Sequence, residues 1–425
     1  MMRRIAQNRF KALTSACVLS MMATVAWSQG PSIRWLGTLG GDWSSAFGVS
    51  ADGSVVVGRS RNSTGQEIAF RWTALGGMQS LGTFGGDRSG AVSVSANGNI
   101  VVGWAYDAQG RWRAFRWENN QMQDLGTLGG NYAEAYGISA DGSVIVGYAA
   151  DSQGRWRACR WANGAVTALF GSDWLYPHSW AWDVSDDGSV IVGSIWKYSD
   201  DYYYYPLNRA FRWRQGSRQN FMDGIAYAVS ADGTVVAGRN DDTQYDCDYY
   251  GCREYVAGDY ASRTTWSNNT YNTQTRRLGN YSFGHSAFDI SADGSIVVGI
   301  SDDKAFRWTQ SGVEDLNVTY ANLLTNGSRL ISAFAISRNG RYIVGVGYNG
   351  ATRRDEAFLL DTGSRCTPHN GDADNNGCID DADLLAVLFA FGNTGSDLGR
   401  VDVNCDQTVD DADLLQVLFN VGNGC

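Results

Sequence analysis

Short apolar runs separated by glycine-containing turns recur along this chain. Seven segments share one pattern of hydrophobic and polar positions: VSADGSVVVG, VSANGNIVVG, ISADGSVIVG, VSDDGSVIVG, VSADGTVVAG, ISADGSIVVG and ISRNGRYIVG. In each, an apolar strand leads into a tight turn, where Asp or Asn and Gly accept the backbone angles required. The unalternating β-branched run that follows predicts a strand buried on both faces. Each segment therefore predicts a β-hairpin.

The hairpins return at a nearly constant interval, which predicts a repeat architecture. Their turn glycines, which define repeats 1 to 7, are Gly53, Gly98, Gly142, Gly188, Gly233, Gly294 and Gly340. Two further apolar motifs follow the hairpin in repeats 1 to 6, some in degraded form, as in Ala69–Trp72 (AFRW) and Leu81–Gly86 (LGTFGG). Four short strands per period, with no helical pattern, predict one propeller blade per repeat.

The two ends of this repeat region predict a closed ring. The last repeat stops at Ala357–Leu360 and lacks a fourth strand, whereas the segment Ile33–Leu39 precedes the first hairpin and has no repeat of its own. Pairing these two segments would complete the last blade and remove an exposed sheet edge. The expected fold class is all-β, a seven-bladed β-propeller, followed by a small α-helical calcium-binding domain.

The combination of "AFRW", "LGTLGG" and "SADGSVVVG" resembles the HAF family of extracellular repeats over roughly Ile33 to Leu360. Where that family has His before Ala-Phe, this chain has Ile68, Arg113 or Arg209. The resemblance implies a propeller-type repeat domain and an exported protein.

The N-terminus predicts export as well. Residues 1–28 combine four basic residues up to Lys11, an apolar run too short to span a bilayer, and small residues at Ala26 and Ser28, which is typical of a signal peptide. We expect a secreted or cell-surface-attached bacterial protein with no membrane span once this segment is removed. The repeat domain is then predicted over residues 29–364 and the C-terminal domain over residues 365–425.

Charge is concentrated in the C-terminal segment. The chain has a formal net charge of −10, and residues 366–425 contain eleven aspartates and one arginine. No basic patch is present to neutralise phosphates, which argues against nucleic acid as a partner.

Two acidic loops in this segment predict calcium binding, with two ions as the cofactor. Oxygen ligands fall at the spacing of an EF-hand loop, and each loop leads into an apolar helix. The predicted ligands are Asp372, Asp374, Asn376, Cys378 (through its carbonyl), Asp380 and Asp383 in the first loop, and Asp402, Asn404, Asp406, Thr408 (through its carbonyl), Asp410 and Asp413 in the second. Gln407 stands at the turn position that Gly377 occupies in the first loop.

The two loop–helix units, with Asp in place of a terminal Glu, resemble a type I dockerin over Gly371 to Phe419. The resemblance implies a cohesin-like protein module as partner and a link to polysaccharide catabolism. Asp381-Ala382 and Asp411-Ala412 repeat before the last ligand, which fits a surface that docks in either orientation.

Seven cysteines follow the predicted signal peptide, and exported cysteines are expected to pair. Cys247 and Cys252 bracket a short loop and are predicted to form a disulfide, and the tail cysteines Cys366, Cys378, Cys405 and Cys425 allow three connectivities. Cys159 stands where other repeats have Phe, which predicts a small buried apolar residue.

The repeat region shows neither a metal-hydrolase motif nor a serine-hydrolase motif. We interpret the recurrent turn aspartates, such as Asp52, and the recurrent AFRW arginines, such as Arg71, as structural because each returns in most repeats; an anion-binding ring of arginines is the alternative. Aromatic insertions break the symmetry in repeats 4 and 5. The candidate ligand surface is formed by Trp174, Tyr176, Trp196, Tyr203 and Tyr250, and packing of these rings on one another is the other interpretation.

Two functions remain open at this point. The first is a secreted, non-catalytic binding or scaffold propeller, attached through the dockerin-like module and recognising a polysaccharide or a surface protein. The second is a carbohydrate-active enzyme of the glycoside hydrolase type, which would hydrolyse O-glycosyl bonds. A close pair of carboxylates in a propeller pocket would favour the enzyme, and an aromatic pocket without one would favour the binding protein.

Overall fold

The computed structural model describes residues 30–171, 177–196, 208–248, 251–267, 270–278, 285–363, 370–373, 378–393, 398–403 and 409–422. The chain divides into two compact units, one formed by Pro31–Thr362 and the other including Gly363–Cys425. Among the described residues, no helix is long and apolar enough to cross a bilayer.

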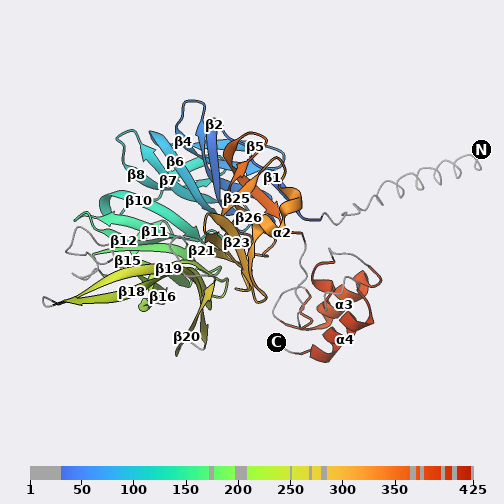
Figure 1. The fold of residues 1–425 in the computed structure, drawn as a ribbon. Coiled ribbons are helices and arrows are strands. Elements are labelled where there is room, and N and C mark those ends of the chain that lie inside the picture. Colours follow the sequence, from blue (N-terminus) through green and yellow to red (C-terminus); the bar gives the residue numbers. More distant parts are fainter. Residues whose placement is uncertain are drawn as a thin grey trace, which may run out of the picture. The chain divides into compact units, whose positions relative to one another are not determined.

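The first unit is built from antiparallel strands in the order of the repeats (Figure 1). The strands of repeats 1 to 3 are β2 (Gly40–Val49), β3 (Val55–Asn62), β4 (Glu67–Thr73) and β5 (Gly77–Gly82); β6 (Gly85–Val94), β7 (Val101–Asp107), β8 (Trp112–Glu118) and β9 (Gln121–Asp124); and β10 (Gly129–Ile138), β11 (Val144–Asp151), β12 (Trp156–Ala162) and β13 (Ala165–Ala168).

Repeats 4 to 7 continue this order. Their strands are β14 (His178–Val184), β15 (Val190–Trp196), β16 (Asn208–Arg214) and β17 (Ser217–Val229); β18 (Val235–Asp248), β19 (Gly251–Ser267) and β20 (Thr270–Leu278); β21 (Ser286–Ile290), β22 (Val297–Ser301), β23 (Lys304–Thr309) and β24 (Gly312–Asp315); and β25 (Arg329–Ile336), β26 (Tyr342–Asn349) and β27 (Arg354–Asp361). Strand β17 is shared, since its first half pairs with β16 and its second half with β18.

The predicted pairing of the two ends is confirmed. Strand β1 (Ser32–Trp35) lies antiparallel to β27, with Ile33 opposite Leu360. The backbone N–H of Leu36 donates to the Ala357 carbonyl at 2.9 Å. On the same flank of β27, opposite β26, the inner strand of repeat 1 meets β27 in a parallel pair of Trp43 and Asp355. The last repeat therefore takes its fourth strand from the start of the domain.

The hydrophobic core lies between successive repeats rather than within one. Each buried cluster joins apolar residues of one repeat to those of the next, as where Val55 and Phe115 share a cluster. The same arrangement joins repeat 7 to repeat 1, with Val344 and Ala357 packed with Val56 and Phe70. Burial of these β-branched and aromatic side chains supplies the driving force for holding the sheets side by side.

The recurrent polar residues have structural roles, as expected. In repeat 1, Asp52 Oδ1 accepts hydrogen bonds from Ser50 Oγ at 2.6 Å and from the Ser54 N–H at 2.9 Å, which fixes the hairpin turn. Arg212 donates to the Gly233 carbonyl of the next repeat and lies 5.0 Å from the ring centroid of Trp266. Arg71, Arg116 and Arg263 likewise donate to the turn glycine of the following repeat. These contacts account for the arginines without an anion.

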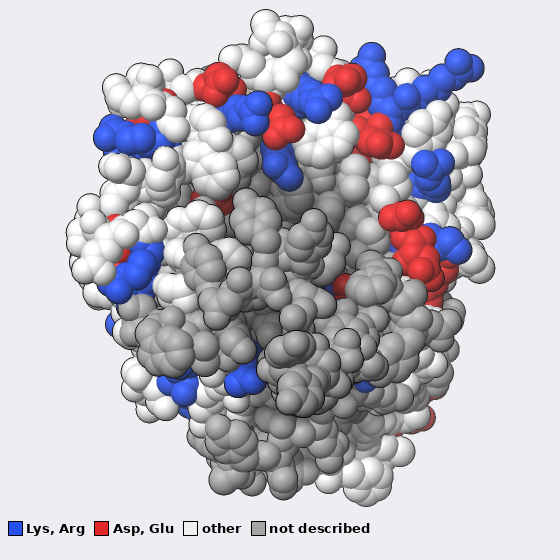
Figure 2. All heavy atoms as spheres, turned by 60° about the vertical axis from the view of Figure 1, so that its left-hand side comes forward, with Lys and Arg blue, Asp and Glu red and all other residues white. Residues whose placement is uncertain are grey.

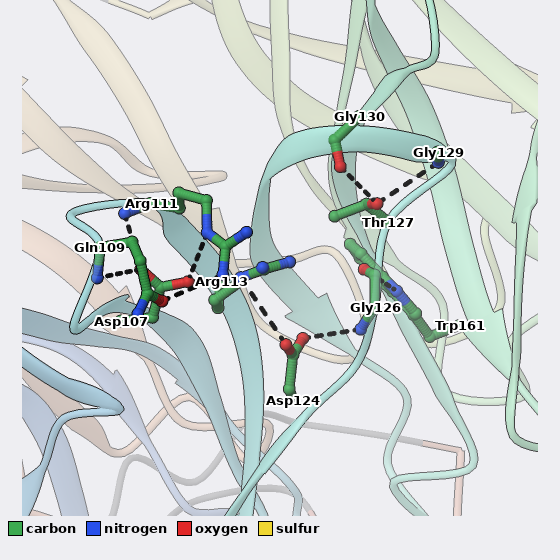
Figure 3. A network of polar contacts seen from close by, with 10 residues as sticks. All are labelled: Asp107, Gln109, Arg111, Arg113, Asp124, Gly126, Thr127, Gly129, Gly130 and Trp161. Carbon is green, nitrogen blue, oxygen red and sulfur yellow. Dashed lines mark hydrogen bonds and ion pairs between the residues drawn. The ribbon is translucent and has the colours of Figure 1, made fainter.

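Two details differ from the sequence-based expectations. The LGTLGG motif is not the fourth strand; it lies at the connection to the next repeat, where Thr127 Oγ1 donates to the Gly130 carbonyl and accepts from the Gly129 N–H (Figure 3). Repeat 6 also contains a short helix, α2 (Leu316–Thr319), and a 3-10 turn, η1 (Ala321–Leu323), although no helix was expected in the repeats. Asp315 caps α2 by accepting from the Asn317 N–H, which favours a helical turn there.

The C-terminal unit contains two equivalent helices, α3 (Asp381–Ala390) and α4 (Asp411–Asn420), and a 3-10 turn, η2 (Gly399–Val401). Asp380 and Asp410 cap these helices, and each cap is reciprocated by the aspartate three residues later. Gly392 N–H donates to the Val409 carbonyl, and Gly422 N–H donates to the Ile379 carbonyl. The two halves therefore exchange equivalent backbone contacts around a shared core that includes Val387 and Val417.

Candidate functional site

A cavity of about 290 Å³ is lined by the inner strands of all seven repeats. One side chain per repeat faces it at the same repeat position: Phe47, Val92, Tyr136, Trp182, Tyr227, Phe288 and Phe334. In every repeat this residue is skipped in the pairing of the inner strand with its neighbour, as between Ala46 and Gly48. A bulge re-aims a side chain. Repetition of the bulge therefore turns these side chains toward a common centre.

Six of the seven side chains are aromatic, and they form a continuous chain of ring contacts that we term the aromatic belt. Neighbouring centroids are 4.5 Å apart for Tyr136 and Trp182, and 5.2 Å apart for Phe288 and Phe334. The chain of contacts crosses from repeat 7 to repeat 1 through Phe334 and Phe47, at 5.0 Å. The belt thus surrounds most of the cavity with ring surface.

The hairpin turns bound one end of the cavity, which we term the turn end. Backbone N–H groups of successive turns donate to the carbonyl of the next, from Ala51 to Ala96 and onward to Arg338. Here an ion pair links non-neighbouring repeats, because Arg338 Nη2 lies 2.6 Å from Asp186 Oδ1. Arg338 also lines the cavity.

Two aspartates line the same cavity next to the aromatic belt. Asp183 Oδ2 accepts from the Val229 N–H at 2.9 Å, and Asp289 accepts from the Ile290 and Ile336 N–H groups, both at 2.8 Å. Burial raises the pKa of Asp183 to about 6. Burial and the charge of Asp183 together raise the pKa of Asp289 to about 7. The two carboxyl groups therefore interact electrostatically, and near neutral pH they carry less than two full charges.

The opposite end, which we term the loop end, is asymmetric. It is the end where β7 and β8, β11 and β12, and β15 and β16 are connected. In Figure 2, Lys and Arg are interspersed with Asp and Glu along the upper and right-hand margins of the face shown. At one such connection, Asp107 accepts from the N–H groups of Gln109 and Arg111 and from the side chains of Arg111 and Arg113 (Figure 3).

An aromatic cluster occupies the loop end at repeats 3 and 4, and we term it the Trp180 cluster. Trp180 lies 5.7 Å from Trp156 and 6.0 Å from Trp196 between centroids. Tyr148 and His178 complete the cluster, at 5.7 Å and 5.3 Å from Trp156. The repeat position of Trp180 carries Glu134 in repeat 3 and Ser45, Gly90, Ile225, Ser286 and Ser332 in the remaining repeats. The cluster is thus a departure from the repeat and not a requirement of the fold.

A buried glutamate joins this cluster to the aromatic belt. Glu134 is only 5% exposed and accepts a hydrogen bond from the Tyr136 hydroxyl. Burial raises the pKa of Glu134 to about 7, against the effect of hydrogen bonds from Tyr136 and Tyr148 and of the Arg59 charge. A carboxyl group that titrates near neutral pH beside stacked rings is the kind of group that binding and catalytic sites use.

The Trp180 cluster is held in one geometry by polar contacts. The Trp156 backbone N–H donates to His178 Nδ1 at 3.1 Å. Burial lowers the pKa of His178, so that the imidazole is neutral at pH 7. The ring therefore acts as an acceptor and a packing surface, and Trp156 retains an exposed fraction of 36% from which a ligand could stack.

The structure describes one of the five residues predicted for the ligand surface. Trp196 belongs to the Trp180 cluster, with its ring 5.5 Å from His178. Trp174, Tyr176, Tyr203 and Tyr250 lie outside the described residues. Glu134, Asp183 and Asp289 were not singled out from the sequence. The sequence could have identified them, because each stands at a repeat position where the other repeats mostly have a small or apolar residue.

The predicted calcium ligands are partly described. Asp372, Cys378, Asp380, Asp383, Asp402, Asp410 and Asp413 are described, whereas Asp374, Asn376, Asn404, Asp406 and Thr408 are not. Within the described part of the chain, no three His, Cys, Asp or Glu side chains come together as a metal site. Asp383 and Asp413 are nevertheless fully buried, and each accepts a backbone N–H of its own loop, from Asp380 and Asp410.

Of the cysteines, Cys159 is free and fully buried among apolar residues, as predicted. Cys247 and Cys252 are directly opposite each other in the β18–β19 pair. Cys378 is disulfide-bonded. Cys366, Cys405 and Cys425 lie outside the described residues, so the tail connectivity stays a prediction.

Comparisons with known proteins identify the fold. No family model and no curated protein matches the chain. Among solved structures, an oligogalacturonate lyase from Vibrio parahaemolyticus is similar with a TM-score of 0.50 at 9% identity, over 78% of this chain and 97% of that one. The β-propeller domain of the trilobed protease from Pyrococcus furiosus has a TM-score of 0.47 at 10% identity, over 78% and 96%. TolB from Acinetobacter baumannii has a TM-score of 0.38 at 13% identity, over 57% of this chain and 55% of that chain.

The first unit is therefore an all-β protein of the β-propeller class. That class follows from the repeated sheets, the shared central cavity and the strand exchange between β1 and β27. The identities are too low to extend the likeness from fold to activity.

Proposed function

We propose that this chain is a secreted binding protein, a seven-bladed propeller that recognises its ligand at the loop end and is attached through its C-terminal module. Seven blades are supported by the cavity, which takes one side chain from the inner strand of each of the seven repeats. Export is supported by the signal-like N-terminal sequence.

The observation that carries the binding role is the Trp180 cluster beside Glu134. Rings that break the repeat symmetry are not explained by the fold, because no other repeat has an aromatic residue at the position of Trp180. A row of indole and phenol surfaces suits the apolar faces of sugar rings, and Glu134 supplies a carboxyl group for their hydroxyls. We therefore propose a polysaccharide as the ligand, with a surface protein as the alternative.

The C-terminal module is proposed to bind two calcium ions and to dock onto a cohesin-like protein. The buried Asp383 and Asp413 support the ion sites, since a buried carboxylate needs a compensating charge. Asp372, Asp380, Asp402 and Asp410 would supply further oxygens, and the bound cation would neutralise the loop charge. The equivalence of α3 and α4 supports a surface that can be used in two orientations.

Glycoside hydrolysis is the second candidate function. The observation that favours it is the pair of acidic side chains, Asp183 and Asp289, on one cavity with interacting charges. Against it, each carboxylate already accepts backbone N–H groups that tie inner strands together. That role accounts for both aspartates without a reaction.

A polysaccharide-array binding assay run beside a reducing-sugar assay separates the two candidates. We expect array binding by the full chain, a loss of at least tenfold in affinity for Trp180→Ala and Trp156→Ala, and no reducing sugar released. Tyr348→Ala, in repeat 7, is the matched control, since its ring packs on Arg329 away from the cluster. Release of sugar that Asp183→Asn abolishes would favour the enzyme instead.

A further inference from the structure

The part of the cavity between the aromatic belt and the turn end differs chemically from the loop end. Its walls are ring surfaces, and its polar side chains include Asp183, Asp289 and Arg338. The whole cavity, at about 290 Å³, falls just below the range of roughly 300–1,000 Å³ typical of small-molecule pockets. It therefore suits a small molecule and not a polymer chain.

The charges in this cavity are unbalanced. Arg338 is the only Lys or Arg among its lining residues, and its ion pair is with Asp186 at 2.6 Å. The hydrogen bonds that Asp183 and Asp289 accept come from backbone N–H groups, which carry no full charge. Among the described residues, no cationic side chain is hydrogen-bonded to either carboxyl group, although the charge of Arg338 acts on both and lowers their pKa values.

We propose that this cavity binds a small organic cation with an alkylated ammonium head, held by the aromatic belt and by the charges of Asp183 and Asp289. Aromatic faces attract a desolvated cation, and the effect reaches about 2 kcal/mol when water is excluded. The proposal does not rest on the polysaccharide-binding role of the loop end.

The hydrogen bonds already made by Asp183 and Asp289 favour a ligand whose ammonium nitrogen is alkylated. Both oxygens of Asp289 already accept a backbone N–H, and Asp183 Oδ2 accepts another. What the pair lacks is a cation bonded to it and not donors, since Arg338 acts on both carboxyl groups through its charge but is paired with Asp186. An alkylated ammonium supplies the charge without N–H groups that would compete for occupied acceptors, and its methyl groups contact the rings of Trp182, Tyr227 and Phe288.

Binding is expected to release protons. Without a cation, burial raises the pKa of Asp183 and Asp289 to about 6 and about 7. A bound cation favours their charged forms and lowers both pKa values. Arg338 is paired with Asp186, and these two charges act in opposite directions on the pKa of Asp183, Arg338 lowering it and Asp186 raising it. Affinity should therefore rise between pH 5 and pH 8.

The test is isothermal titration of the full, calcium-saturated chain with tetramethylammonium chloride, against tert-butanol as a neutral probe of similar shape. We expect the cation to bind at least tenfold more tightly than tert-butanol, to bind more tightly at pH 8 than at pH 5, and to release protons in buffers of different ionisation enthalpy. Equal binding of the two probes, or binding independent of pH, would overturn the proposal. So would displacement of tetramethylammonium by magnesium chloride, which would assign a metal site instead.

Variants locate the site. Asp183→Asn and Asp289→Asn should each weaken tetramethylammonium binding at least tenfold. Asp141→Asn is the matched control, because repeats 2 and 7 carry Asn97 and Asn339 at the same turn position, so the fold tolerates it. Phe288→Leu keeps an apolar side chain but removes a ring, and should weaken binding severalfold even if the aspartate variants do not fold. Unchanged affinity in Phe288→Leu, or an equal loss in Asp141→Asn, would count against the site.

Discussion

The backbone N–H of Ala357 donates to Ser44 Oγ at 2.9 Å, across 313 residues of sequence. The same bond joins neighbouring repeats elsewhere, from Ala69 to Ser89 and from Ala158 to Ser179, each at 2.9 Å. In both Ser44 and Ser89, the hydroxyl also donates to a glycine carbonyl at 2.6 Å. The junction between the last and the first repeat therefore uses the contact found between consecutive repeats.

Because the two junctions use the same contact, we predict that substituting either serine lowers the free energy of unfolding by the same amount. Ser44→Ala and Ser89→Ala each leave a buried N–H and a carbonyl without a partner, and each should destabilise the protein by about 1–3 kcal/mol. Urea unfolding followed by tryptophan fluorescence measures both. A much smaller cost for Ser44→Ala would show that the ring junction is weaker than the others.

Removal of the N-terminal strand β1 should expose the edge of the sheet formed by the last repeat. Deletion of Ile33–Leu39 removes the partner of β27 and leaves its N–H and C=O groups unpaired. We expect a lower melting temperature and concentration-dependent self-association by light scattering. A deleted protein that stays monomeric and as stable as the intact chain would contradict the closure.

The burial of Glu134 predicts a pH dependence of stability. The folded-state pKa of about 7 is higher than the ordinary value of 4.5, so this contribution to stability is fully present below about pH 4.5 and is lost as pH rises through 7. Its size is at most about 3 kcal/mol, at 1.36 kcal/mol per pKa unit. Relative to the wild type, Glu134→Gln should therefore gain thermal stability between pH 5 and pH 8. Glu118→Gln, at the surface, is the control and should show no such gain.

We predict that replacing a buried arginine between repeats costs more stability than replacing an arginine at the surface. Arg212 is 5% exposed, bonds the Gly233 carbonyl and stacks on Trp266, so Arg212→Met should cost about 1.5–3 kcal/mol. Arg61 pairs with Asp42 at the surface, and Arg61→Met should change stability by less than about 0.5 kcal/mol. Thermal or urea denaturation of the two variants side by side tests this contrast.

Calcium is predicted to order the C-terminal unit. Titration of the chelator-treated full chain should give two ions per chain, and calcium should protect the segment after Gly363 from limited proteolysis. Asp383→Ala and Asp413→Ala should each reduce the stoichiometry to one. Asp381→Ala is the matched control, because Asp381 is exposed at the start of α3.

The second site should be weaker, since Gln407 stands at a turn position that glycine accepts more readily. Two ions retained in both alanine variants would contradict the assignment.

The sequence by itself determined the repeat, the hairpins, the pairing of Ile33 with the last strand and the two C-terminal helices. These are local or periodic features: a turn needs Gly53, a buried strand needs Val55 to Val57, and an odd strand at one end needs a partner at the other. The structural roles of Asp52 and Arg71 followed from the same reasoning, since a residue required in most repeats serves the repeat.

Only the tertiary structure decided which departures from the repeat come together. Asp183 and Asp289 are 106 positions apart in the numbering and meet on one cavity because the ring brings inner strands to a common centre. Glu134 became notable only when its burial against Tyr136 and Tyr148 was visible, since solvent exposure sets its pKa and sequence does not report exposure. The ion pair of Arg338 with Asp186 has the same origin, because two residues unremarked in sequence are joined by the closure of the ring.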